Sequence, residues 1–139
     1  MTVSERAFVA LGSNLGDRLQ HLSHGREGLS RLERTTLVAE SSIEETAPLG
    51  PGDQGPYLNQ MVLLDTDLTP RELLRHCHEI EDLAGRVRGE RWGARTLDLD
   101  IVRFGDRVER NDDLVIPHPE ISNRTFWQRE IEELELHVR

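Results

Sequence analysis

Apolar residues follow two periods along the chain, and the switches between them predict an order of strands and helices. Short apolar runs, which are typical of strands, cover residues 7–11, 37–43, 58–64, 96–104 and 114–116. Helical spacing covers residues 15–32, residues 70–84 and a last segment through Trp127, Ile131 and Leu134. The order β, α, β, β, α, β, followed by a small strand and a helix, predicts an α+β, ferredoxin-like sandwich with helices packed on an antiparallel sheet.

Polar residues at the expected helix ends support these boundaries. Asp17 suits the positive N-terminal end of the first helix. Thr69-Pro70-Arg71-Glu72 has the form of a capping box with proline at the first helical position. Gly85 is typical of a helix end, and Ser122 or Asn123 is the expected cap of the last helix.

Two long loops interrupt the pattern, at residues 46–56 and 86–95, and loops of this length are often functional. A shorter junction, Gly12-Ser13-Asn14, predicts a turn after the first strand. Its spacing to Gly16 also resembles a nucleotide-binding loop. A tight structural turn is favoured, because the phosphate-loop motif requires a lysine and the sequence has none.

Composition limits the class of protein. The 139 residues, 36% hydrophobic and 31% charged, fit one globular domain. The sequence shows no membrane-length apolar run and no signal peptide, so we expect a cytoplasmic protein without a membrane partner. The net charge of −9 argues against nucleic-acid binding. The single cysteine, Cys77, is expected to be a buried, inert thiol.

The segment Thr96-Leu97-Asp98-Leu99-Asp100-Ile101 is the first candidate for chemistry. In a strand its leucines would face the core, and both carboxylates would share the other face, about 7 Å apart. Two carboxylates so placed suit Mg²⁺, which takes oxygen ligands and shares them with phosphates. The alternative is an ordinary amphipathic strand with a solvated acidic face.

The loop before this strand favours the metal interpretation. Four arginines, Arg86, Arg88, Arg91 and Arg95, surround Trp92 between glycines. Arginines beside carboxylates are what a magnesium–triphosphate site requires. A set of exposed salt bridges is the alternative, and each of those would contribute little.

Other polar and aromatic residues are ambiguous one by one. Tyr57 offers a ring for stacking, and Asn59 offers a donor and an acceptor for a flat polar heterocycle. Phe126 is expected to be a core residue on the sequence alone. His118, held between two prolines, could donate to a phosphate oxygen. The helix histidines are expected to be solvated, because no paired cysteine spacing supports zinc.

These segments together resemble the 6-hydroxymethyl-7,8-dihydropterin pyrophosphokinase family over roughly residues 7–127. The segments are Ala10 to Asp17, Thr46-Ala47-Pro48-Leu49-Gly50, Tyr57-Leu58-Asn59, Gly85 to Gly105, Pro117-His118-Pro119 and Asn123-Arg124-Thr125-Phe126. The resemblance implies a transferase of folate biosynthesis that moves a diphosphoryl group from ATP to the pterin and acts as a monomer. A non-catalytic pterin- or nucleotide-binding member of the family is the alternative.

The resemblance also implies roles for individual residues. Asp98 and Asp100 would hold two Mg²⁺ ions. The residues implied near ATP are Glu81, Arg86, Trp92, Arg95, Ile101, His118 and Arg124, with Arg86, Arg88 and Arg95 also implied in catalysis. The residues implied around the pterin are Thr46, Leu49, Tyr57, Asn59 and Phe126.

The chain departs from the family pattern at three positions and at its end. Ala47, Glu44 and Ala94 replace the residues usual there, and none of these deletes an implied ligand. The single pyrophosphokinase domain expected over residues 1–139 has a C-terminus shorter than is usual for the family.

Overall fold

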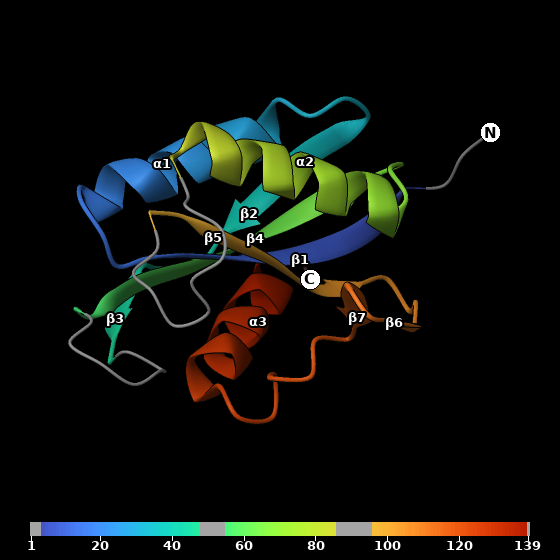
Figure 1. Ribbon diagram of the computed structural model, residues 1–139. Helices are drawn as coiled ribbons and strands as arrows, with labels where there is room; N and C mark the ends of the chain where they lie inside the picture. Colours follow the sequence, from blue (N-terminus) through green and yellow to red (C-terminus); the bar gives the residue numbers. More distant parts are fainter. Residues whose placement is uncertain (1–3, 48–54, 86–95, 139) are drawn as a thin grey trace.

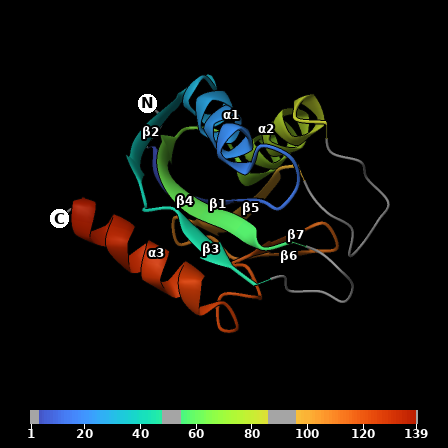
Figure 2. The ribbon, with the colours of Figure 1, turned by 90° about the vertical axis from the view of Figure 1, so that its left-hand side faces the viewer.

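A computed structural model describes residues 4–47, 55–85 and 96–138 of the chain. Two helices lie side by side on one face of a twisted sheet, and a third helix crosses the opposite face (Figures 1 and 2). The strands are β1 (Glu5–Ser13), β2 (Thr35–Glu40), β3 (Glu44–Thr46), β4 (Tyr57–Thr66), β5 (Asp98–Phe104), β6 (Glu109–Asn111) and β7 (Leu114–Ile116). The helices are α1 (Arg18–Ser30), α2 (Pro70–Leu83) and α3 (Thr125–His137).

The main sheet has the strand order β2-β4-β1-β5, with β3 pairing to β4 and all neighbours antiparallel. The long strands β1 and β4 therefore lie at the centre of this sheet, and β5 is an edge strand. This topology confirms the predicted ferredoxin-like α+β sandwich. Strands β6 and β7 form a separate two-stranded hairpin.

Alternation along the strands divides the core into two layers. Leu99 and Ile101 of β5 join Leu11 of β1 in the larger apolar cluster, which lies under α1 and α2. Met61 of β4 joins residues of α3 in a smaller cluster on the other face. Burial of apolar area on both faces stabilises the sandwich.

The expected helix boundaries at α1 and α2 are confirmed in detail. The Asp17 side chain accepts a hydrogen bond from the Gln20 N–H and caps α1. Thr69 and Glu72 form a capping box at the start of α2, in which each side chain accepts from the other's backbone N–H. Cys77 is fully buried, and burial raises the pKa of its thiol far above the ordinary value, as expected of an inert cysteine.

Three predicted boundaries are wrong. The strand expected at residues 37–43 ends at Glu40, because the buried Ser41 hydroxyl accepts from the Met61 N–H in place of a regular ladder bond, and β3 at Glu44–Thr46 was not predicted. Gly12 belongs to β1 and not to a turn. The N-cap of α3 is Arg124, which makes no side-chain capping bond, and not Ser122 or Asn123.

Candidate active site

The two candidate metal ligands lie on β5, with their side chains on the face that carries α3. Leu99 and Ile101, at the alternate positions, are 5% exposed and lie in the opposite apolar layer. Asp98 and Asp100 are partly exposed, and the Asp100 side chain keeps 43% of its accessible surface. The alternation predicted for this strand is therefore confirmed, and it leaves both carboxylates accessible to a ligand.

A row of residues across four strands leads from these carboxylates to the candidate pterin residues. The register pairs Asp98 with Gly12, Gly12 with Asn59, and Asn59 with Glu44. Neighbouring strands are about 4.8 Å apart, so Asn59 and Asp98 are separated by about 10 Å across a position without a side chain. Gly12 is itself buried, and the gap is the position between Asn59 and Asp98 at which β1 presents no side chain.

Tyr57 and Asn59 border the gap on the β4 side. A Cβ built on Gly12 would lie 3.5 Å from the Tyr57 ring and 3.5 Å from Asn59 Oδ1. The Asn59 amide nitrogen donates to the Thr46 hydroxyl at 2.6 Å, which fixes the orientation of the amide. The structure thus brings together Thr46, Tyr57 and Asn59, three of the residues that the sequence assigned to the pterin.

A cavity of about 350 Å³ runs along the outer edge of β5, on the other side of the carboxylates. Asp100 lines it and Asp98 pairs with Gly12, so the aspartates of β5 lie between the cavity and the position without a side chain at Gly12. The cavity is lined from α2, β5, the β6–β7 hairpin and the segment after it. The lining residues are Leu74, His78, Glu81, Leu99, Asp100, Ile101, Asp112, Asp113, Leu114, Val115, His118 and Pro119.

Glu81 connects α2 to the metal-candidate strand. It is 1% exposed, and its Oε2 accepts from the Leu99 backbone N–H at 2.8 Å. Leu99 lies between the two aspartates, so this bond holds the backbone that positions them. Glu81 also lies in the cavity lining, and its bond to the Leu99 N–H is structural.

His118 lies beside Asp100 with a defined tautomer. Its Nδ1 accepts from the Glu120 backbone N–H at 3.1 Å, so the ring proton lies on Nε2, which is 3.9 Å from Asp100 Oδ1. Burial, followed by the charge of Arg124, lowers the pKa of His118 below its usual value. The imidazole is therefore a neutral donor at pH 7, directed at the carboxylate side of the cavity.

The segment after the cavity places the last two predicted residues. Arg124 starts α3, and its guanidinium carbon is 4.4 Å from the centre of the Trp127 ring. Phe126 is 7% exposed and belongs to the apolar cluster beneath α3, with its ring 6.3 Å from that of Trp127. The sequence expectation that Phe126 is a core residue is therefore confirmed.

The two carboxylates on β5 suit Mg²⁺ shared with a substrate better than a metal ion whose ligands all come from the protein. Within residues 4–47, 55–85 and 96–138, no group of three or more His, Cys, Asp or Glu side chains could hold a metal ion. Mg²⁺ is commonly held by one or two carboxylates, with substrate phosphates and water completing its octahedron. Asp98 and Asp100, partly exposed beside a cavity, match that pattern.

Several predicted residues lie outside the described part of the chain, and others were missed. Leu49, Arg86, Arg88, Trp92 and Arg95 belong to the first group. The missed features are the bare position at Gly12, the Asp112–Asp113 lining and the contacts of Trp127. A glycine inside a strand is a known signal for close approach of a ligand, and it was available in the sequence.

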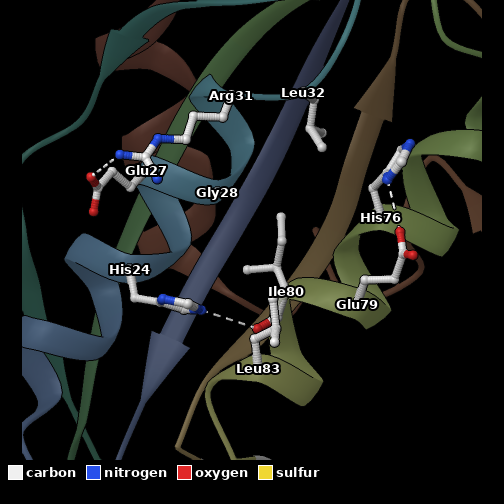
Figure 3. A pocket seen from close by; sticks show the side chains of 9 residues that line it. All are labelled: His24, Glu27, Gly28, Arg31, Leu32, His76, Glu79, Ile80 and Leu83. Carbon is white, nitrogen blue, oxygen red and sulfur yellow. Dashed lines mark hydrogen bonds and ion pairs between the residues drawn. The ribbon is translucent and has the colours of Figure 1, made fainter.

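A second cavity, of about 410 Å³, lies away from these residues in the groove between α1 and α2 (Figure 3). His24 Nε2 lies 3.3 Å from the Ile80 carbonyl, and His76 pairs with Glu79 at 2.8 Å. Several of its polar groups therefore already pair within the two helices. Asp98 and Asp100, the residues implied at the reaction centre that the structure describes, are not among those that line it.

Comparison with known proteins agrees with this geometry. Residues 8–136 match the family model described as 7,8-dihydro-6-hydroxymethylpterin-pyrophosphokinase (HPPK). The chain belongs to the HPPK family. Two relatives are named 2-amino-4-hydroxy-6-hydroxymethyldihydropteridine pyrophosphokinase. The one from Haemophilus influenzae is 44% identical over 86% of this chain and 75% of its own length. The one from Pseudomonas aeruginosa is 43% identical over 88% of this chain and 75% of its own length.

A solved structure supports the fold at lower identity. Plasmodium falciparum HPPK-DHPS, crystallised with pterin and p-hydroxybenzoate, matches with a TM-score of 0.58 at 13% identity. The match covers 99% of this chain and 34% of that one, so this chain spans about a third of the Plasmodium protein. The likeness supports the fold of this chain alone, and it says nothing about the rest of the Plasmodium protein.

Proposed function

We propose that this chain transfers the diphosphoryl group of ATP to 6-hydroxymethyl-7,8-dihydropterin, giving the pterin diphosphate and AMP. The family match over residues 8–136 and the 40–45% identity to named pyrophosphokinases support this activity and its place in folate biosynthesis. The comparisons give no support to a non-catalytic family member.

One observation carries the location of the chemistry. Asp98 and Asp100 lie on β5, between the cavity at its outer edge and the position without a side chain at Gly12. A triphosphate in the cavity and a flat heterocycle at Gly12 would meet at the two carboxylates. The reaction needs this geometry, because the pterin hydroxyl oxygen must approach the β-phosphorus in line with the departing AMP oxygen.

Asp98 and Asp100 would hold two Mg²⁺ ions shared with the ATP phosphates. When bound, Mg²⁺ neutralises phosphate charge and orients the phosphates for in-line transfer. The support is the donor chemistry: two accessible carboxylates at alternate strand positions, with Asp100 in the cavity lining.

Neutral and cationic donors would stabilise charge on the transferring group. The Nε2–H of His118 faces this region, and Arg124 lies close enough to lower the pKa of His118. Arg86, Arg88, Arg95 and Trp92 belong to the same proposal on the family resemblance alone. The bond from the hydroxyl oxygen to the β-phosphorus forms as the bond from the β-phosphorus to the oxygen shared with the α-phosphate breaks. AMP leaves with that electron pair, and the hydroxyl proton is lost to water.

The pterin would lie above Gly12. Tyr57 and Asn59 border that surface, with Thr46 fixing the Asn59 amide. Phe126 would cover the ring from the side of α3, and Leu49 would contribute backbone contacts. A fixed amide with one donor side and one acceptor side suits the edge of a pterin.

The remaining properties are proposed on sequence grounds. Residues 1–139 would act as a single pyrophosphokinase domain, monomeric and cytoplasmic, on small-molecule substrates and without nucleic-acid partners. In the described part of the chain, no helix has the length and apolarity to cross a bilayer.

The direct test is incubation with ATP, Mg²⁺ and 6-hydroxymethyl-7,8-dihydropterin, with AMP and ADP quantified separately. We expect pterin-dependent AMP without ADP. AMP that forms equally without pterin, or ADP as the product, would contradict diphosphoryl transfer. A folded protein that binds ATP and the pterin but forms no AMP would favour the binding-only alternative.

A further inference from the structure

Trp127 lies between His118 and Arg124, the two residues of the C-terminal segment that are candidates to donate hydrogen bonds to phosphate. It is 2% exposed, yet its neighbours include charged and polar side chains. The His118 imidazole packs perpendicular to the indole, with ring centres 4.8 Å apart. The Arg124 guanidinium carbon lies 4.4 Å from the indole centre. One buried side chain therefore contacts both donors.

The backbone around Trp127 brings these groups together. The Ile121 N–H donates to the His118 carbonyl at 3.3 Å, and the Arg124 N–H donates to the Glu120 carbonyl at 3.0 Å. The Trp127 N–H then donates to the Arg124 carbonyl at 3.0 Å. These successive turns return the chain from the cavity to the first turn of α3. His118 itself is fixed to β5, because its N–H donates to the Val102 carbonyl at 2.9 Å.

The indole restricts both donors for physical reasons. An arginine side chain loses substantial rotamer entropy when a ligand fixes it, so a preformed stack reduces the cost of binding. A flat, electron-rich ring attracts the guanidinium face, and an edge-to-face contact orients the imidazole. Trp127 also belongs to the apolar cluster under α3, and this packing makes the indole rigid.

We propose that Trp127 is a positioning residue for diphosphoryl transfer, whose indole holds the His118 imidazole and the Arg124 guanidinium towards the same ATP triphosphate. This inference rests on the proposed function. It adds to it a residue that does not touch substrate and that acts through two residues that do.

The test compares Trp127→Leu and Trp127→Phe with a matched core variant, Leu134→Ala. Leu134 is fully buried on the same stripe of α3 and belongs to the same cluster. Trp127→Leu should raise the KM for ATP about tenfold, because it removes both ring contacts. Trp127→Phe keeps a ring and should recover most of that loss. Leu134→Ala should lose stability but keep the wild-type KM for ATP.

A readout without turnover separates this inference from the proposed function. The Kd for an unhydrolysable ATP analogue in the presence of Mg²⁺ should rise about tenfold in Trp127→Leu, because both donors lose the contact that restricts them, and it should keep its wild-type value in Leu134→Ala. Calorimetric titration measures this Kd without pterin, so the result stands even when no AMP is formed.

Each result supports or overturns the inference. Tenfold increases in the KM for ATP and in the Kd for the analogue, both confined to Trp127→Leu, would support it. An active wild type in which Trp127→Leu matches Leu134→Ala in both readouts would overturn it. When Trp127→Leu does not fold, the larger Trp127→Met, which also lacks a ring, takes its place: raised KM and Kd support the inference, and values equal to those of Leu134→Ala contradict it.

Discussion

The two faces of the sheet differ in what they bury. The face under α1 and α2 is packed by a continuous apolar layer that includes Leu11, Leu99 and Ile101. The face under α3 has a smaller apolar cluster and carries Asp98 and Asp100 beside it. Because adjacent residues of one strand belong to opposite faces, stability and chemistry are separated by a single step along β5.

The largest expected effect tests this separation within β5. Asp98→Asn and Asp100→Asn should each reduce AMP formation about a thousandfold, because they remove charge that Mg²⁺ and the phosphates require. Both side chains are partly exposed, so the free energy of unfolding should change by less than about 1 kcal/mol. Rates from quenched assays and unfolding in urea measure the two quantities.

Leu99→Ala is the matched control between the two aspartates. It should lower the free energy of unfolding by about 2–5 kcal/mol through the cavity left in the apolar layer. A variant of Asp98 or Asp100 that is as unstable as Leu99→Ala, with proportionate loss of activity, would show that the carboxylates are structural.

The glycines give a second comparison between the faces. A Cβ at Gly12 meets Asn59 and Tyr57 at 3.5 Å, which is ordinary contact, but it would occupy the surface proposed for the pterin. Gly12→Ala should therefore leave stability nearly unchanged and raise the KM for pterin about tenfold. A Cβ at Gly25 lies 2.8 Å from Leu11 Cδ2, so Gly25→Ala should cost about 1–3 kcal/mol of stability.

Steady-state kinetics and thermal unfolding of both alanine variants distinguish the outcomes. A KM for pterin that is unaltered in Gly12→Ala would remove the pterin from the sheet surface above that residue. A stable Gly25→Ala variant would show that the helix can move away from the sheet.

Glu130 on α3 gives a pH-dependent difference between the faces. It is fully buried, and neither carboxyl oxygen has a hydrogen-bond partner among the described residues. Burial, followed by the charges of Glu44 and Glu133 against that of Arg129, raises the pKa of Glu130 to about 8. The neutral carboxyl is therefore the form that packs in the folded protein.

The sign of the pH effect follows from this raised pKa. Between the ordinary value of 4.5 and about 8, the folded state binds a proton that the unfolded state has released. The free energy of unfolding should therefore fall by roughly 1–3 kcal/mol as pH rises through this range. Glu130→Gln should remove this dependence, and Glu132→Gln, which alters an exposed residue of the same helix, should keep it. Identical pH profiles for wild type and Glu130→Gln would contradict the assignment.

The smallest effect concerns the cavity between α1 and α2. Glu27 lines it and pairs with the exposed Arg31 at 2.8 Å. Glu27→Gln should change stability by less than about 0.5 kcal/mol and leave AMP formation unaltered. A marked loss of activity would show that this cavity takes part in the reaction.

Much of the fold follows from local patterns in the sequence. Alternation in β5 predicted which residues face the core, and the capping box at Thr69 predicted the start of α2; both are confirmed. The break between β2 and β3 could not be predicted, because it depends on the Ser41 hydroxyl meeting a backbone N–H twenty residues away in sequence.

The candidate site could be predicted only in part from the sequence, for the same reason. Asp98, Asp100 and Asn59 could be nominated from residue type and spacing, and the register then places them around Gly12. The gap at Gly12 and the contacts of Trp127 arise from pairing between distant segments. Sequence periodicity describes one segment at a time and does not contain such pairings.

Calorimetric titration with an unhydrolysable ATP analogue, with and without Mg²⁺, tests the central claim most directly. The claim is that Asp98 and Asp100 make the α3 face of β5 a magnesium–nucleotide site. We expect binding heat that requires Mg²⁺ and that is lost in the Asp98→Asn, Asp100→Asn double variant, while Leu11→Ala, a variant of the opposite apolar layer outside the cavity lining, keeps it below its unfolding temperature. Equal binding without Mg²⁺, or in the double variant, would contradict the account.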